Sequence, residues 1–99
     1  LDSLLREYQE DGTYANDKYF NKYIETSGYI TTITEFGSLI NVDLEPSKDY
    51  TFSLNLRCDV DKDDYASILT IGQQITVITK IGERDYHSNV ISSKDCTIR

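Results

Sequence analysis

The chain is poor in the residue types that carry most catalytic and metal chemistry. Its 99 residues include one histidine, two cysteines, one proline and no methionine or tryptophan. No Cys-x-x-Cys spacing is present, which disfavours a zinc site and a dithiol redox centre. His87 has no serine or cysteine nucleophile beside it in a recognisable motif, so we interpret it as a surface residue. These absences argue against an enzyme and imply no cofactor.

Long apolar runs are also missing. No segment approaches the roughly 20 apolar residues that a membrane-spanning helix needs. Apolar types make up 38% of the chain, and eight tyrosines and three phenylalanines add bulk to them. One domain over residues 1–99, with a single core and a polar exterior, is the expected organisation. The start at Leu1, without a methionine and without a signal peptide, predicts a chain that is either trimmed or mature and processed.

Positive charge is scarce. Ten lysines and arginines face seventeen carboxylates, and the net charge is -7. Proteins that bind nucleic acid draw most of their nonspecific affinity from lysine and arginine against phosphate. The overall charge therefore argues against nucleic acid and anionic membrane surfaces as partners, although it leaves room for a local basic patch.

What the chain does have is a long run of strand-forming residues. Residues 23–36 are dense in Ile, Thr and Tyr, the types that suit a pleated and half-buried surface. The run is longer than most strands, and Gly28 lies inside it. A glycine within a strand marks a bulge or a sharp bend. We expect one long strand that bends at Gly28 and serves both sides of a small closed barrel.

Periodicity and turn residues predict the other elements. Alternation of apolar and polar residues predicts further strands over 39–44, 50–58, 73–81 and from about 90 to 99, with a turn at 82–85. Helical spacing predicts a helix that ends at Gly12 in the left-handed cap position, and a second over 13–20 with Tyr14 and Phe20 facing the barrel. A helix over 62–71, with Ile68 and Leu69 on its inner face, separates the third and fourth strands.

This order of elements predicts an all-β fold, a five-stranded OB-fold Greek-key barrel with an N-terminal helix and a helix between strands three and four. Residues 1–20 form the N-terminal helical segment and residues 23–99 form the barrel.

Several short motifs resemble one family. They are Tyr8 with Ala15, Lys18 and Tyr19; Lys22, Ile24 and Gly28-Tyr29-Ile30; Leu56-x-Cys58; Ile68-Leu69-x-x-Gly72-Gln73-x-Ile75-Thr76-Val77; and Cys96-x-Ile98. In order and spacing the chain resembles the bacterial tRNA-anticodon-like (tRNA_anti-like) OB-fold family. Two positions depart from it, because Thr79 stands where the family often has glycine and Ser93 where it often has an apolar residue.

The resemblance implies a non-enzymatic binding or accessory module of the bacterial cell envelope, of the kind found in lipoprotein chains. That location allows a lipid anchor upstream of Leu1 and a periplasmic setting. The implied ligand is an unknown protein, peptide or small polar molecule. The alternative is a domain that binds single-stranded nucleic acid or oligosaccharide, as other OB-folds do.

One acidic cluster and the two cysteines each have two interpretations. Asp59-Val60-Asp61-Lys62-Asp63-Asp64 has carboxylates at alternate positions, but a calcium loop needs glycine sixth and glutamate twelfth, and Asp64 and Thr70 stand there. We interpret these acids as the start of a helix capped by Asp61 and predict no metal site.

Cys58 and Cys96 lie on strands that neighbour each other in an OB barrel, so they can form a disulfide or remain two buried thiols.

The expected ligand surface is the face made by strands one to three and the loop at 45–49. The candidate contacts are Tyr29, Tyr50 and Arg57. Arg57 alternates with the apolar residues of its strand, so its side chain is expected on the opposite side of the sheet from theirs. Tyrosines also serve as amphipathic packing at a barrel rim, and this interpretation stays open for both of them.

Overall fold

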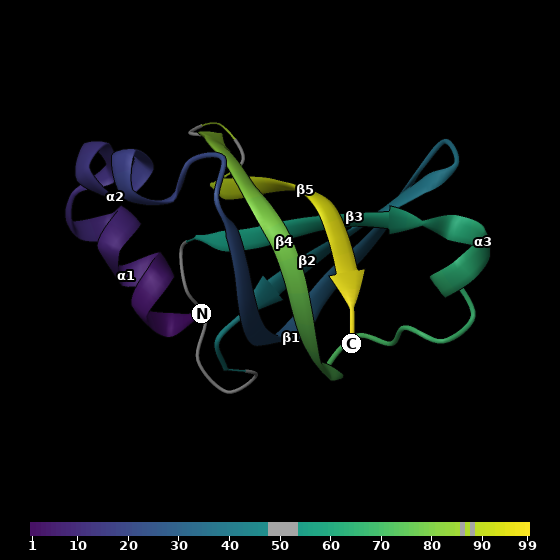
Figure 1. Ribbon diagram of the computed structural model, residues 1–99. Coiled ribbons are helices and arrows are strands. Elements are labelled where there is room, and N and C mark those ends of the chain that lie inside the picture. Colours follow the sequence, from purple (N-terminus) through teal and green to yellow (C-terminus); the bar gives the residue numbers. More distant parts are fainter. Residues whose placement is uncertain (48–53, 86, 88) are drawn as a thin grey trace.

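The protein is a closed barrel of five strands with a helical hairpin at one end (Figure 1). The computed structural model describes residues 1–47, 54–85, 87 and 89–99. The strands are β1 (Tyr23–Phe36), β2 (Leu39–Glu45), β3 (Asn55–Asp61), β4 (Gln74–Asp85) and β5 (Val90–Ile98), in the barrel order β1-β2-β3-β5-β4. The helices are α1 (Asp2–Glu10), α2 (Gly12–Tyr19) and α3 (Lys62–Tyr65). The predicted all-β OB barrel is confirmed.

Strand β1 joins the two sides of the barrel, as its length predicted. From Tyr23 to Tyr29 it pairs with β4, and from Tyr29 to Phe36 it pairs with β2. Gly28 lies at this crossing. A Cβ atom there would come within 2.7 Å of the Leu1 side chain and 3.0 Å of the Glu45 carbonyl oxygen. Glycine is therefore required because neighbouring backbone approaches it closely.

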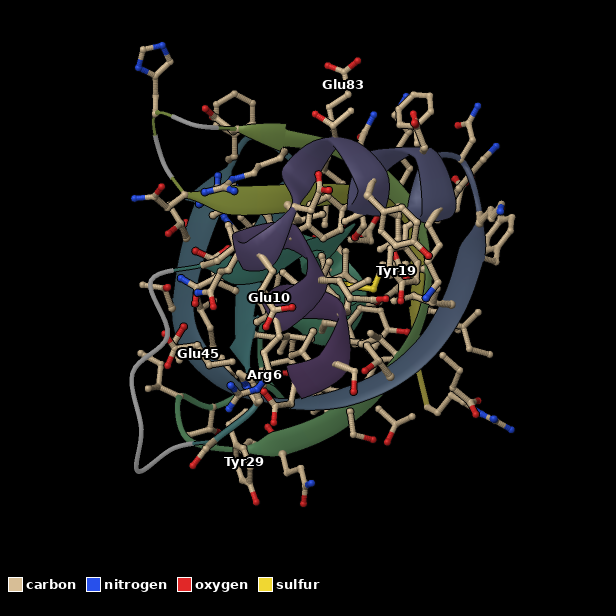
Figure 2. All side chains as sticks on the ribbon, turned by 90° about the vertical axis from the view of Figure 1, so that its left-hand side faces the viewer. Arg6, Glu10, Tyr19, Tyr29, Glu45 and Glu83 are labelled. Atoms are coloured by element: carbon tan, nitrogen blue, oxygen red, sulfur yellow. A yellow bond between two sulfur atoms is a disulfide. The ribbon has the colours of Figure 1, made fainter. Side chains whose placement is uncertain are left out.

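The helical hairpin covers one open end of the barrel (Figure 2). Helix α1 contributes Leu4, Leu5 and Tyr8 to the core, all at most 5% exposed. The ring of Tyr8 stacks on that of Tyr19 in α2, with 6.1 Å between centroids. Glu7 accepts hydrogen bonds from Lys18 and from the Tyr19 hydroxyl. The N-terminal segment is thus part of the core and closes it.

The start of the chain differs from the prediction in two respects. Gly12 is not a left-handed cap but the first residue of α2, whose N-cap Asp11 accepts a hydrogen bond from the Tyr14 amide at 3.1 Å. Tyr14 and Phe20 do not face the barrel, being 59% and 40% exposed. The inner stripe of α2 instead runs from buried Ala15 to half-buried Tyr19, four residues on, which places Tyr14 outside it.

Strand β3 ends later than predicted, β4 is longer than predicted and α3 is shorter. β3 continues past Cys58 to Asp61 because its alternation persists to buried Val60; the part predicted at 50–53 lies outside the described residues. The turn predicted at 82–85 is instead the end of β4, where Gly82 lies against Ser92.

The helix predicted over 62–71 is one turn that ends at Tyr65. Asp61 caps it as expected, accepting from the Asp63 amide at 2.8 Å. Leu69 packs partly against the core, as predicted, but Ile68 is 59% exposed.

The barrel closes between β3 and β5 through a short parallel ladder. Among the described residues, three register pairs join them, from Asn55 with Val90 to Arg57 with Ser92. Beyond the ladder, a disulfide links Cys58 to Cys96 with Cα atoms 5.8 Å apart. The buried Ser93 hydroxyl donates to the Arg57 carbonyl at 2.7 Å. Side chains thus hold this seam where backbone pairing ends.

The two departures from the family pattern have related roles. Ser93 bonds across the β3–β5 seam, and the fully buried Thr79 hydroxyl donates to the Lys94 carbonyl at 3.0 Å, beside a register shift between β4 and β5. Each buried hydroxyl therefore donates a hydrogen bond to a backbone carbonyl at a point where the regular pairing of the strands is interrupted.

We predict that removing the disulfide lowers the free energy of unfolding. The bond closes a loop with a sequence separation of 38 residues, which in the loop-entropy treatment corresponds to about 4 kcal/mol. Urea unfolding of a Cys58→Ala, Cys96→Ala variant measures the loss, and a reductant should destabilise the wild type but not the variant. Alkylation of both thiols without prior reduction, seen by mass spectrometry, would contradict the bond.

A second prediction concerns the crossing of β1. Gly28→Ala should destabilise the protein by about 1–3 kcal/mol in urea unfolding, because the Glu45 backbone has to move away from the added methyl group. Thr34→Ala, at an exposed position of the same strand, is the control and should change stability by less than about 1 kcal/mol. Equal effects of the two substitutions would show that the close approach at Gly28 is not limiting.

Candidate functional site

The candidate site is the outer face of β1, β2 and β3, the sheet face that OB-folds use for ligands. Its centre is a row of three residues in register, in which Thr32 of β1 lies opposite Asp43 of β2, and Asp43 lies opposite Arg57 of β3. Because partners in register project to the same side of a sheet, the three side chains meet on the outside of the barrel. A neighbouring row places Asn41 opposite Asp59.

A two-point ion pair occupies the centre of this face. Arg57 donates from Nε to Asp43 Oδ1 at 2.8 Å and from its terminal NH2 to Oδ2 at 3.1 Å. The Thr32 hydroxyl donates to the same Oδ2 at 3.2 Å. The Asp43 side chain is 10% exposed and that of Arg57 is 30% exposed. Such a fork-to-fork geometry fixes the guanidinium plane and leaves one edge of it open to solvent.

Negative charge exceeds positive charge around this pair. The hydrogen bond with Asp43 raises the pKa of Arg57, and Asp59 and Asp85 add to the effect. Burial raises the pKa of Asp59, despite the attraction of Arg57. Among the described residues, Asp59 Oδ1 is a buried oxygen without a hydrogen-bond partner. One arginine therefore faces three carboxylates, one of which has an unused acceptor.

The structure brings two of the three predicted contacts onto this face. Arg57 is there as its strand parity predicted, and Tyr29 lies on the same side, opposite Glu45 where β1 crosses (Figure 2). Tyr29 is half-buried, so the rim-packing interpretation suits it as well as ligand contact. Tyr50 lies outside the described residues. Asp43 and Thr32 were missed, because their position beside Arg57 depends on strand register.

Two hollows lie away from this face, along the edge between α2 and β4. One, of about 270 Å³, is lined by residues that include Asn16, Asp17 and Arg84. The other, of about 240 Å³, is lined by residues that include Phe20, Gly82 and Lys94.

Within residues 1–47, 54–85, 87 and 89–99, no group of three or more His, Cys, Asp or Glu side chains is placed to hold a metal ion. His87 is exposed, and its amide donates to Asp85 Oδ1 at 2.9 Å. No described helix is long and apolar enough to cross a membrane.

Comparison with known proteins agrees with the barrel and its motifs. The tRNA_anti-like family matches the chain over residues 1–97. The chain belongs to the tRNA_anti-like family. A crystal structure from Klebsiella pneumoniae subsp. pneumoniae, described as a "putative nucleic acid-binding lipoprotein", is similar to this tRNA_anti-like chain with a TM-score of 0.73. The two are 16% identical over 97% of this chain and 85% of the other, which supports the fold alone. A search of curated proteins found no match.

We predict a pH-dependent gain in stability from Asp59→Asn. The pKa of Asp59 is raised by burial above its usual 3.8, so the folded state holds this proton more tightly than the unfolded state. The free energy of unfolding of the wild type should therefore fall, relative to the variant, as pH rises from below the unfolded pKa through the folded pKa.

The measurement is the difference in melting temperature between Asp59→Asn and wild type at several pH values. We expect the difference to favour the variant most at neutral pH and to shrink in acid, where Asp59 is protonated in both states. A difference that grows in acid would show that the attraction of Arg57 outweighs burial.

Proposed function

We propose that this chain is a non-enzymatic binding module of the bacterial cell envelope, and that its ligand surface is the outer face of β1, β2 and β3. The ligand is a protein, peptide or small polar molecule that presents basic or hydrogen-bond-donating groups. The observation that carries this proposal is the Asp43–Arg57 pair, held by Thr32 and bordered by the unsatisfied carboxylate of Asp59.

The charge of the face favours such a ligand. Its arginine already donates from Nε and NH2 to Asp43, which neutralises its charge, so it offers little to a phosphate. Asp59 instead adds a half-buried carboxylate that forms no ion pair within the described residues. The positive charge of a lysine or an arginine of a partner would compensate this carboxylate. Long-range attraction by a chain of net charge -7 would raise the rate of encounter with a basic ligand.

The envelope location rests on three supports. The family resemblance implies it, the Klebsiella relative is described as a lipoprotein, and the barrel seam carries a disulfide of the kind that persists in oxidising compartments. A small barrel gains stability there from a covalent link between β3 and β5.

The second candidate function is binding of single-stranded nucleic acid or of an oligosaccharide, as in other OB-folds. The description of the Klebsiella relative favours the nucleic-acid alternative. The β1–β3 face does not, because its central cation is neutralised by Asp43 and Tyr29 beside it is half-buried. The exposed aromatic of this face, Phe36, lies at the far end of β1.

Backbone NMR titration tests the proposal. A short lysine-rich peptide should shift the amide signals of Thr32, Asn41 and Asp59 in a saturable way, and Asp59→Asn should weaken the binding. Asp17→Asn, at an exposed position of α2 that removes the same charge, is the matched control and should bind as the wild type does. Shifts confined to α1 and α2, or equal weakening by both variants, would place the ligand elsewhere.

A further inference from the structure

We propose a second ligand surface, on the outer face of β1, β4 and β5, that binds a short stretch of single-stranded nucleic acid by base stacking and phosphate contacts. It consists of Phe20, Tyr23, Lys80 and Lys94 and is called here the aromatic–lysine face. The inference is independent of the proposed function, because β1 contributes different residues to the two faces and the ligand has the opposite charge.

Strand register builds the centre of this face. Tyr23 of β1 lies opposite Lys80 of β4, and Lys80 lies opposite Lys94 of β5. Their in-strand neighbours Thr79 and Ser93 are buried, so the two lysines are on the outside of the barrel. One aromatic ring and two ammonium groups therefore form a row across three adjacent strands, with β4 between the other two (Figure 1).

The aromatic ring of Tyr23 is held in place yet exposed. Lys80 Nζ lies 5.9 Å from the ring centroid, and the hydroxyl group donates to Asp95 Oδ2 at 3.2 Å. Tyr23 is still 58% exposed. A ring that is fixed at both ends and open to solvent is suited to stacking, because little conformational freedom remains to be lost on binding.

The lysines of this face lack carboxylate partners. In the described part of the chain, Lys18 and Lys62 form ion pairs with Glu7 and Glu35, whereas Lys80 and Lys94 form none. Like charges directly opposite each other on a sheet are destabilising, so this pair leaves a repulsion that a bound anion would relieve. Lys22, exposed and next to Tyr23, also has no ion pair in the described structure.

A hollow next to the row supplies a second apolar contact. Phe20, 40% exposed, and Lys94 both line the hollow of about 240 Å³ at the end of α2. Glu83 also lines it, Asp95 borders Tyr23, and Glu25, two residues along β1 from Tyr23, forms an ion pair with Arg99. The face therefore carries acids as well as cations, and what distinguishes it is that Lys80 and Lys94 form no ion pair within the described residues.

Aromatic rings beside unpaired cations match the chemistry of a single strand, whose flat bases alternate with phosphates. A polyanion without flat rings would use the lysines but leave Tyr23 and Phe20 without a role. The small number of cations limits the contact to about two or three phosphates and predicts weak, salt-sensitive binding.

The test is fluorescence anisotropy with a labelled oligothymidylate of about ten nucleotides, titrated with the full chain at several salt concentrations. We expect saturable binding in which the logarithm of the association constant falls with the logarithm of salt concentration with a slope of about -1.4 to -2. Tyr23→Leu should weaken binding about fivefold or more. Lys80→Gln with Lys94→Gln should reduce the magnitude of the slope by about 1.4.

Lys62→Gln is the matched control, since it removes a lysine that is already paired with Glu35 on another part of the barrel. It should leave affinity and slope unchanged, and melting curves should show that each variant is folded. Absence of saturable binding at low salt would overturn the proposal. So would equal weakening by Lys62→Gln and the Lys80/Lys94 variant. A sulfated polysaccharide that competes fully, together with unchanged binding by Tyr23→Leu, would overturn it in favour of simple polyanion attraction.

Discussion

The rest of the structure depends on how the barrel closes between β3 and β5. The parallel ladder there has three register pairs, whereas β1 alone pairs along seven residues with β4 and again with β2. A seam this short needs other links, and it has two: the Cys58–Cys96 disulfide and the Ser93 hydroxyl on the Arg57 carbonyl. Closure at this seam removes both edges of the sheet and gives the core its enclosed volume.

Arg57 connects this seam to the outer face. Its carbonyl accepts a hydrogen bond from the Ser93 hydroxyl of β5, and its guanidinium donates hydrogen bonds to the Asp43 carboxylate of β2. The residue that helps close the barrel is thus also the one that orients the central ion pair of the candidate ligand surface. Loss of the contacts between β3 and β5 would disturb both the packing of the core and the position of the ion pair on this surface. We therefore expect stability and binding to be coupled at Arg57.

Residue composition and the alternation of apolar and polar residues predicted the features that depend on a short stretch of sequence. The bounds of β1 followed from its Ile, Thr and Tyr content, and the outward direction of Arg57 followed from strand parity. Gly28 lies next to the residue where β1 changes partner, and its close contacts explain the glycine, whereas the register shift of β1 lies between Ile30 and Thr32. The predicted length of α3 was wrong. Ile68 has the spacing of a helical inner face, but it does not pack against the core and is 59% exposed.

The site partners could not be predicted in the same way. Which residue lies beside Arg57 depends on the register of β2 against β3, and the pairing of Lys80 with Lys94 depends on register shifts in β4 and β5. The sequence names the charged residues but not their neighbours. As a result the net charge of -7 does not reveal that, within the described residues, Lys80 and Lys94 lack ion pairs on one face while Asp59 Oδ1 lacks a hydrogen-bond partner on the other.

Paramagnetic probes of opposite charge distinguish the face with the unpaired lysines from the face with the Asp43–Arg57 pair and Asp59. A cationic and an anionic nitroxide are added separately to the isotope-labelled protein, and broadening of each amide signal is compared. We expect the cationic probe to broaden the signals of Asn41 and Asp59 more strongly, and the anionic probe to broaden those of Tyr23, Lys80 and Lys94 more strongly. Equal broadening of both sets by the two probes would contradict this expectation.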